Sequence, residues 1–226
     1  MKFSYRFVII TALFVTCLLT ANIIASKVVD FGPFTLPAAV IIFPFSYIFG
    51  DILTEVYGYR QARKVIWLGF LCNLIFVIFA WLGKLLPPSS LWTGQDAYVT
   101  ILGYTPRILL ASFLGYLAGE FSNSFVLAKM KIMTKGKWLW SRTISSTIIG
   151  EGLDSIIFII VAFAGTPLFA AIMILWHWLV KIAIEVTFTP LTYLIVNFLK
   201  KSEGIDTYDY NINFNPIRIR ERKTVE

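Results

Sequence analysis

Residues 107–154, RILLASFLGYLAGEFSNSFVLAKMKIMTKGKWLWSRTISSTIIGEGLD, decide the fold. They contain two apolar segments of helical length, joined by a basic stretch with four lysines between Lys129 and Lys137. The first segment carries Glu120, and the second carries Glu151 and Asp154. A carboxylate that faces lipid is costly. We therefore expect these three acids to face the interior of a helical bundle, beside a partner or a ligand.

Helical spacing places two kinds of residue on defined faces of the first segment. Its polar face consists of Ser112, Tyr116, Glu120 and Asn123. Its small face consists of Ala111, Gly115 and Gly119, four residues apart. A stripe of small residues lets the backbone of a neighbouring helix come close. The pattern predicts a tightly packed pair of membrane helices.

The composition is that of an all-α integral membrane protein. The 226 residues are 58% hydrophobic and only 15% charged, with a mean hydropathy of +0.75, whereas soluble domains are about 25% charged. The formal charge of +7 does not indicate nucleic-acid binding, because the basic residues cluster beside the apolar segments. Cys17 and Cys72 fall inside such segments and form neither a disulfide framework nor a metal-ligand pattern.

Six segments are long enough to cross a bilayer, which takes about 20 residues: 5–26, 34–56, 63–86, 107–129, 143–164 and 168–199. Most of the 20 Lys and Arg residues fall on the side of the two chain ends, so both termini are predicted to be cytosolic. Residues 1–201 are expected to form the six-helix transmembrane transporter domain, and 202–226 a cytosolic tail. The first segment is expected to remain uncleaved, and the polar stretch 87–105 to lie outside the bilayer.

The second segment is unusual because prolines interrupt it. These are Pro33, Pro37 and Pro44. Proline can break a helix, and broken helices often line the binding cavities of transporters. Asp51 and Glu55 lie one turn apart near its cytosolic end, and their simplest expected partners are Arg60, Arg63 and Lys64.

Other polar groups at membrane depth have more than one interpretation. Asn22 is equally consistent with a pocket donor and with a helix–helix hydrogen bond, and Asn73 is the polar group inside the third segment. Lys181 and Glu185 lie one helical turn apart and either neutralise each other or take part in coupling. His177, between two tryptophans, is either a packing residue or a proton relay.

The chemistry of these groups favours binding over catalysis. Carboxylates beside aromatic rings such as Tyr116 and Phe158 suit a planar heterocycle with adjacent N–H donors, for example a guanine-like edge; a cationic amine also fits. We find no zinc motif, no nucleophile–histidine arrangement and no phosphate-binding glycine loop. We therefore expect no metal, no cofactor and no enzymatic activity, with an intramembrane enzyme as the less favoured alternative.

Several blocks resemble the queuosine precursor transporters, a family also described as vitamin uptake transporters. The blocks are Asn22-Ile-Ile-Ala-Ser-Lys27, Gly50-Asp-Ile-Leu-Thr54, Tyr57-Gly58, Arg107-x4-Ser112-x6-Gly119-Glu-x2-Asn123, Lys129-Met-Lys131, Arg142-Thr-x-Ser-Ser146 and Gly150-Glu-x2-Asp154-x3-Phe158. The resemblance implies a multi-pass protein of the bacterial inner membrane. It implies import of a 7-deazaguanine base for tRNA modification: the 7-cyano or 7-aminomethyl precursor, or queuine. The family is also similar to the substrate-binding subunits of energy-coupling-factor vitamin transporters. Ala21-x-x-x-Ala25 resembles the coupling motif of those subunits, so such a subunit is the alternative.

The expected substrate-binding residues combine these observations. They are Glu120, Asn123, Glu151 and Asp154, with Tyr116, Phe158, Asn22 and Asn73. The expected supporting or coupling residues are Lys181, Glu185, His177, Asp51, Arg107 and Arg142, the two arginines anchoring the helix ends of the site. The expected partners are the small-molecule base and the lipid bilayer, with a homodimer left open and no nucleic acid.

Overall fold

The computed structural model describes residues 4–31, 34–103, 106–165, 169, 171–210 and 212–217. Pro33 and the last nine residues of the predicted tail lie outside the described residues. The elements follow one another as α1 (Tyr5–Ile24), β1 (Val28–Phe31), β2 (Phe34–Pro37), the short 3-10 helix η1 (Ala38–Ile41), α2 (Phe43–Tyr57), α3 (Tyr59–Leu85), α4 (Gln95–Leu102), α5 (Pro106–Met133), α6 (Leu139–Phe163) and α7 (Ala171–Glu203).

Five helical stretches of the described chain are long and apolar enough to cross a membrane: α1, α3, α5 with the α4 before it, α6 and α7. The surface of these helices is apolar, with exposed side chains such as Phe79, Leu114 and Leu194, whereas the interior holds charged groups such as Glu120 and Lys181. Soluble proteins show the reverse arrangement. The distribution therefore fits a bundle whose surroundings are lipid.

The predicted second span, 34–56, is wrong over its first half. Residues 34–37 form a strand that pairs antiparallel with β1, from Val28 opposite Pro37 to Phe31 opposite Phe34. The helix α2 begins only at Phe43 and has 15 residues, a length of about 22 Å at 1.5 Å per residue. That is shorter than the hydrocarbon core of about 30 Å. The break lies where Pro37 and Pro44 interrupt the segment, since proline disrupts a continuous helix.

The small-residue stripe of α5 packs on α6, as the sequence predicts. A Cβ added at Gly119 would lie 3.0 Å from the carbonyl oxygen of Gly150, and one added at Gly150 would lie 2.8 Å from that of Gly119. The two backbones therefore approach each other at a pair of facing glycines. This contact sets the spacing of the helices that carry Glu120 and Asp154.

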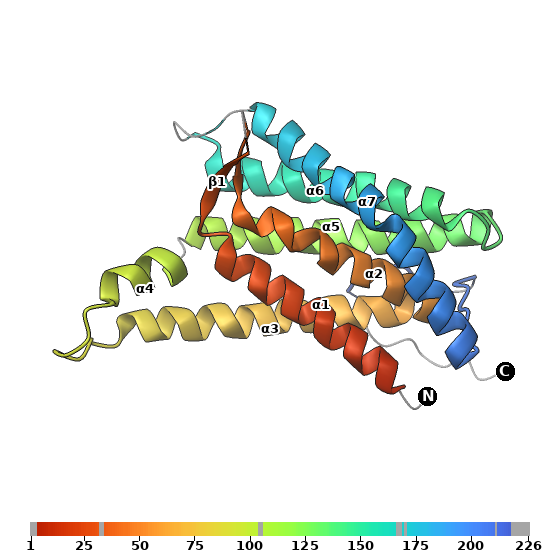
Figure 1. Cartoon of the computed structure of the whole chain (residues 1–226), viewed down its shortest axis with the longest axis horizontal. Helices are drawn as coiled ribbons and strands as arrows, with labels where there is room; N and C mark the ends of the chain where they lie inside the picture. The colour runs from red at the N-terminus through yellow and green to blue at the C-terminus, as the bar shows by residue number, and fades with distance from the viewer. Residues whose placement is uncertain are drawn as a thin grey trace.

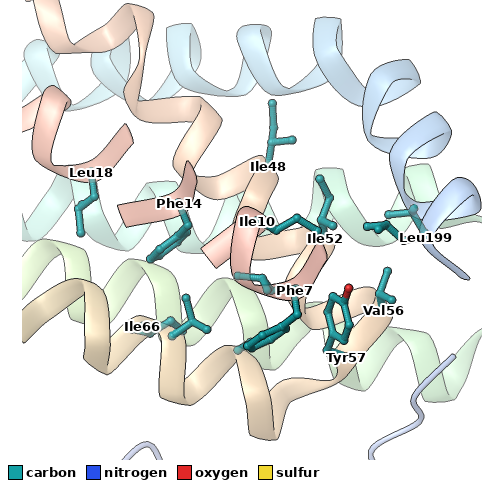
Figure 2. Close-up of a cluster of buried hydrophobic side chains, with 14 of the residues drawn as sticks. Phe7, Ile10, Phe14, Leu18, Ile48, Ile52, Val56, Tyr57, Ile66 and Leu199 are labelled. Atoms are coloured by element: carbon teal, nitrogen blue, oxygen red, sulfur yellow. The ribbon is translucent and has the colours of Figure 1, made fainter. Parts of the chain in front are cut away.

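The apolar core lies at the crossing of α1, α2 and α3, close to the end of α7 (Figure 1). Figure 2 shows Phe7 and Phe14 of α1, Ile52 and Val56 of α2, Ile66 of α3 and Leu199 of α7 within one cluster. All six side chains are buried. The Tyr5 end of α1 and the Glu203 end of α7 meet at this end of the bundle, where Ser4 Oγ donates a 2.7 Å hydrogen bond to Glu203 Oε1.

Helix α7 bends along its length in Figure 1. It contains Pro190, which has no N–H to donate to the preceding turn and so allows a kink. The bend lets the first half of α7 follow α6 while its last turns approach α1 and α2.

The segment after α7 folds back across the ends of α2, α3 and α5. Asp209 Oδ2 accepts a 2.8 Å hydrogen bond from the backbone N–H of Tyr59 at the start of α3, where no local side chain caps the helix. Arg63 of α3 donates to the carbonyl oxygens of Asn213 and Asn215, each at 2.8 Å. The predicted boundary between the transmembrane domain and the tail, at residues 201 and 202, stays a prediction. The helix α7 itself continues to Glu203.

Replacing Gly119 by Ala should destabilise the packing of α5 against α6 and α2, because the new methyl group would lie 3.0 Å from the carbonyl oxygen of Gly150 on α6 and closer still to the Tyr47 hydroxyl on α2. We expect a loss of about 1–3 kcal/mol, the usual effect of overpacking, measured as a lower unfolding temperature in detergent. Gly152→Ala is the matched control, since its nearest neighbour is a Trp178 side-chain atom at 3.3 Å. Equal stability of the two variants would contradict this packing.

Asp209→Ala should remove the cap of α3 and destabilise the protein by about 1 kcal/mol, the typical effect of losing a cap. Asp209→Asn keeps an oxygen that can accept the same hydrogen bond, so it should retain most of the stability. Thermal unfolding of the three proteins checks this, and an alanine variant as stable as the wild type would show that the cap contributes nothing.

Candidate functional site

The centre of the site is an ion cluster between α6 and α7. Lys181 Nζ donates to Glu151 Oε2 at 2.6 Å and to Asp154 Oδ2 at 2.5 Å. All three side chains are buried, with Asp154 the most exposed at 5%. The three-residue spacing of Glu151 and Asp154 puts both carboxylates on one face of α6, so a single ammonium group reaches both. Its positive charge also lies 4.3 Å from the ring centre of Phe43.

Two adjoining chambers lie beside this cluster. The inner chamber, of about 60 Å³, is lined by Asp154, Lys181 and His177 together with Phe43. The outer chamber, of about 340 Å³, extends to Thr100 at the end of α4 and falls in the size range of small-molecule sites, about 300–1,000 Å³. Both are lined by Asn22, Ala25, Pro37, Ser112 and Phe158.

Three helices contribute neutral polar groups to the wall that the chambers share. Asn22 of α1 donates a 2.7 Å hydrogen bond to Asn73 Oδ1 of α3 and accepts one of 3.3 Å from Ser112 Oγ of α5. Asn22 therefore fits both interpretations of its position, because it makes a helix–helix hydrogen bond and also lines a cavity. Asn73 lines the outer chamber.

Aromatic rings of α6 and α7 also line the inner chamber. The rings of Phe158 and His177 are nearly parallel, with centres 6.3 Å apart and planes at 28°. His177 Nδ1 lies 3.2 Å from Ser155 Oγ, so its ring is oriented by α6. A flat ring and a carboxylate, Phe158 and Asp154, thus stand one helical turn apart on the same wall.

The remaining predicted substrate residues do not line either chamber. Tyr116 is buried and donates to the carbonyl oxygen of Ile66 at 2.9 Å. Asn123 donates to Asp51 Oδ1 at 2.6 Å. Glu120 is fully buried, and neither of its carboxyl oxygens has a hydrogen-bond partner in the described part of the chain. Glu151 adjoins the inner chamber through Lys181.

The expected pairing of Lys181 with Glu185 is wrong. Lys181 bonds to the two acids of α6, and the Glu185 carboxyl, 1% exposed, has no hydrogen-bond partner among the described residues. Residues four apart on one helix can meet, but here the pair on α6 offers Lys181 two carboxylates instead of one.

The expected partners of Glu55 and Asp51 are also wrong. Asp51 bonds to Asn123, and Glu55 Oε1 accepts from Arg142 at 2.8 Å and from Lys200 at 2.6 Å. These cations come from α6 and α7, far along the chain, and not from the neighbouring turn of α3. Of the two predicted arginine anchors, Arg107 donates to the carbonyl oxygens of Val161 and Ala164 at the end of α6. Arg142 instead joins Glu55, away from the chambers.

The Glu55 network closes the end of the bundle away from the chambers. Lys131 Nζ lies 3.6 Å from Glu55 Oε1 and 2.5 Å from Asp206 Oδ1. Lys200 joins the same two acids, at 2.6 Å and 2.9 Å. Burial alone would raise the pKa of Asp206, but hydrogen bonds from Lys131 and Lys200 hold that pKa below its usual value. The segment after α7 is thereby bound to the helix ends by charge.

Sequence reasoning missed several residues of the site. The chambers are also lined by residues of the broken second segment, namely Pro37, Ala39, Val40 and Phe43. The prolines were the available signal, since they marked a break of the kind that lines cavities. Ala21 and Ala25 line the inner chamber as well, and Ala21 is 1% exposed. This small-residue pair therefore faces the cavity and offers no exposed docking stripe.

Comparison with known proteins identifies the family. A family model described as "Putative vitamin uptake transporter" matches residues 37–195. The chain is 30% identical over 188 residues to the "Probable queuosine precursor transporter" of Bacillus subtilis, covering 81% of each protein. It is 24% identical over 168 residues to the "Queuosine precursor transporter" of Escherichia coli, covering 70% of this chain and 72% of that protein. No solved structure matches the chain.

The match covers well over half of the chain, and it includes α2, α5, α6 and most of α7, the helices that carry the ion clusters. The five apolar helices and the buried charges agree with this assignment. The chain therefore belongs to the queuosine precursor transporter family, also described as vitamin uptake transporters, and is a multi-pass protein of the bacterial inner membrane.

Proposed function

We propose that the protein imports a queuosine precursor, a 7-deazaguanine base, through the two chambers. The observation that carries this proposal is the Asp154 carboxylate, held by Lys181 on the wall of a cavity inside a membrane bundle, one turn from the ring of Phe158. A cavity with few polar groups on an aromatic wall is the usual form of a small-molecule site. The names of the relatives support the choice of substrate.

The base fits this wall by hydrogen bonding and stacking. A guanine-type edge presents a ring N–H next to an exocyclic amine, and a carboxylate accepts both. The Lys181 ammonium can donate to the neighbouring carbonyl oxygen of the base. Phe158 offers a flat face for the ring, and Asn22 can satisfy a further polar atom at the junction of the chambers. The preference among the cyano and aminomethyl precursors and queuine would depend on the group at position 7.

The proposed direction of transport follows from the two ends of the bundle. The chambers are lined by residues of the hairpin and of α4, which lie at the end of the bundle away from the N-terminus of α1 and the C-terminus of α7 (Figure 1). The Glu55 network involves the last turns of α2 and α7 and closes that other end. The closed end is rich in Lys and Arg, which supports a cytosolic assignment by the positive-inside rule. In this topology both chain ends are cytosolic, and the short α2 crosses the bilayer together with the hairpin and η1. The structure then corresponds to a state whose cavity faces outward.

Among the predicted substrate residues, Asp154 and Phe158 have the most direct access to the base. Glu151 would act through Lys181, by keeping the ammonium in place when the base competes for Asp154. Direct contact of Glu120 and Asn123 with the base stays a prediction that requires an inward movement of the substrate.

Asp154→Asn should reduce uptake of radiolabelled 7-cyano-7-deazaguanine into liposomes containing the purified protein. Hydrogen bonds to a charged group contribute about 1.5–3 kcal/mol, so we expect a fall in apparent affinity of about tenfold to one hundredfold. Asp96→Asn, a substitution at an exposed position of α4, is the matched control and should transport normally. Unchanged uptake by the Asp154 variant, with correct insertion, would refute this role.

The same liposomes separate this proposal from the two alternatives. A substrate-binding subunit that depends on a separate ATPase would show no uptake on its own. An intramembrane enzyme would return a chemically altered base, whereas a transporter delivers it unchanged, as chromatography of the vesicle contents would show.

Binding should also appear as stabilisation of the folded protein. A ligand at one hundred times its Kd stabilises the folded state by about 2.7 kcal/mol. We expect 7-deazaguanines to raise the unfolding temperature of the wild type, and an analogue without the exocyclic amine to raise it much less. If the analogue stabilised the protein equally well, the Asp154 carboxylate would not be hydrogen-bonded to the edge of the base that carries the amine.

A further inference from the structure

A second group of acids lies deeper in the bundle than the substrate cavity. It consists of Asp51 on α2, Glu120 on α5 and Glu185 on α7, each at most 1% exposed. Along α2, Asp51 lies one turn before Glu55 of the closed end, and along α7, Glu185 lies one turn after Lys181 of the cavity wall. These acids therefore occupy the layer between the cavity and the closed end, and none of them lines either chamber.

These carboxyls are short of partners in the described part of the chain. Asp51 Oδ2, both oxygens of Glu120 and both oxygens of Glu185 accept no hydrogen bond. The nearby cations are already engaged: Lys181 by Glu151 and Asp154, and Arg142 and Lys200 by Glu55. A buried, ionised carboxylate without a cation or donor costs several kcal/mol. The packed arrangement is therefore compatible with these groups only when they are neutral.

Unpartnered neutral groups point to the same conclusion. Asn123 uses its amide N–H on Asp51, while its Oδ1, also buried, accepts no hydrogen bond. The Tyr47 hydroxyl is fully buried, has no hydrogen-bond partner among the described residues, and lies against Gly119, next to Glu120 in the chain. The Glu120 carboxyl reaches α2 at Gly50, where an added Cβ would be 3.0 Å from Oε2. Protonated carboxyls at Asp51 and Glu120 would thus have unused acceptors close by, the Asn123 amide oxygen and the Tyr47 hydroxyl.

The charges around the cluster are mostly negative. The titratable groups that face its three acids are Tyr47 and Glu55 on α2, Tyr116 on α5, Glu151 and Asp154 on α6, and Lys181 on α7. Lys181 is the one cation in that set. Among the described residues, no group of three or more acids, histidines or cysteines is arranged to hold a metal ion. A proton neutralises a carboxylate by binding one oxygen and needs no further coordinating groups. The proton is therefore the ligand that fits these acids.

We propose that Asp51, Glu120 and Glu185 form a proton-binding site that couples uptake of the base to inward movement of protons. In each cycle, while the bundle returns to its outward-facing state, a carboxylate takes a proton from hydronium that enters from the cavity side, forming an O–H bond and leaving water. The neutral acid is then buried, as in the structure described here, beneath a cavity that can receive the base. When the closed end opens, water reaches the cluster, the O–H bond breaks and the proton leaves to the cytosol with the base.

This proposal rests on the proposed function, and the two can fail separately in one set of liposomes. Two activities are measured with 7-cyano-7-deazaguanine: exchange of labelled for unlabelled base without a gradient, and accumulation driven by an acidic exterior with the membrane potential clamped. With one proton per base, the wild type should accumulate a neutral base up to about tenfold for each pH unit. A pH-sensitive dye inside the vesicles should report acidification that depends on the base.

Glu120→Gln should retain exchange and lose accumulation, because its amide mimics the neutral acid and cannot release a proton. Glu185→Gln provides a second variant in case the first does not fold, and Glu203→Gln at the end of α7 is the matched control, expected to accumulate like the wild type.

Wild-type exchange with no response to the pH gradient would overturn the coupling while leaving the transporter intact. Full accumulation by both cluster variants would overturn the assignment of the site. Absence of exchange by the wild type would instead overturn the proposed function, and the coupling with it.

Discussion

The structure depends on one ammonium group held between two carboxylates in the membrane interior. Lys181 bonds to Glu151 and Asp154 at 2.6 Å and 2.5 Å, and removing one partner of such a buried pair typically costs about 3–5 kcal/mol. The cluster fixes α7 on α6 and, at the same time, presents one of its carboxylates to a cavity. Stability and recognition therefore share the same charges, and a ligand that hydrogen-bonds to Asp154 necessarily competes with a contact that holds two helices together.

Around this cluster the bundle is asymmetric from end to end. The cavity end is built from short or irregular elements, namely the β1–β2 hairpin, η1 and α4. The closed end is tied by Glu55 to Arg142 and Lys200 and covered by the chain after α7. A transporter must open each end in turn.

The sequence was most informative where the pattern is local. Helical spacing predicted the small-residue stripe of α5 and the close approach of a neighbouring helix to it, the inward position of Glu120 and Asp154, and the extents of the long helices to within a few residues. It was least informative where partners are distant in the chain. Arg142 and Lys200 meet Glu55 across separations of 87 and 145 residues, and no spacing rule connects them. Likewise, Glu185 lies one turn from Lys181 on the same helix, but Lys181 bonds to Glu151 and Asp154 on α6, which together offer two carboxylates. The prolines signalled a break in the second segment, whereas the hairpin that fills it depends on pairing between residues 28–31 and 34–37.

The most direct test of the account is an experimental structure of the protein with bound 7-cyano-7-deazaguanine. We predict density for a flat ring beside Phe158, with its ring N–H and exocyclic amine within hydrogen-bond distance of the Asp154 carboxylate and Lys181 still bonded to Glu151. A base bound elsewhere, with Asp154 engaged only by Lys181 as in the free protein, would contradict it.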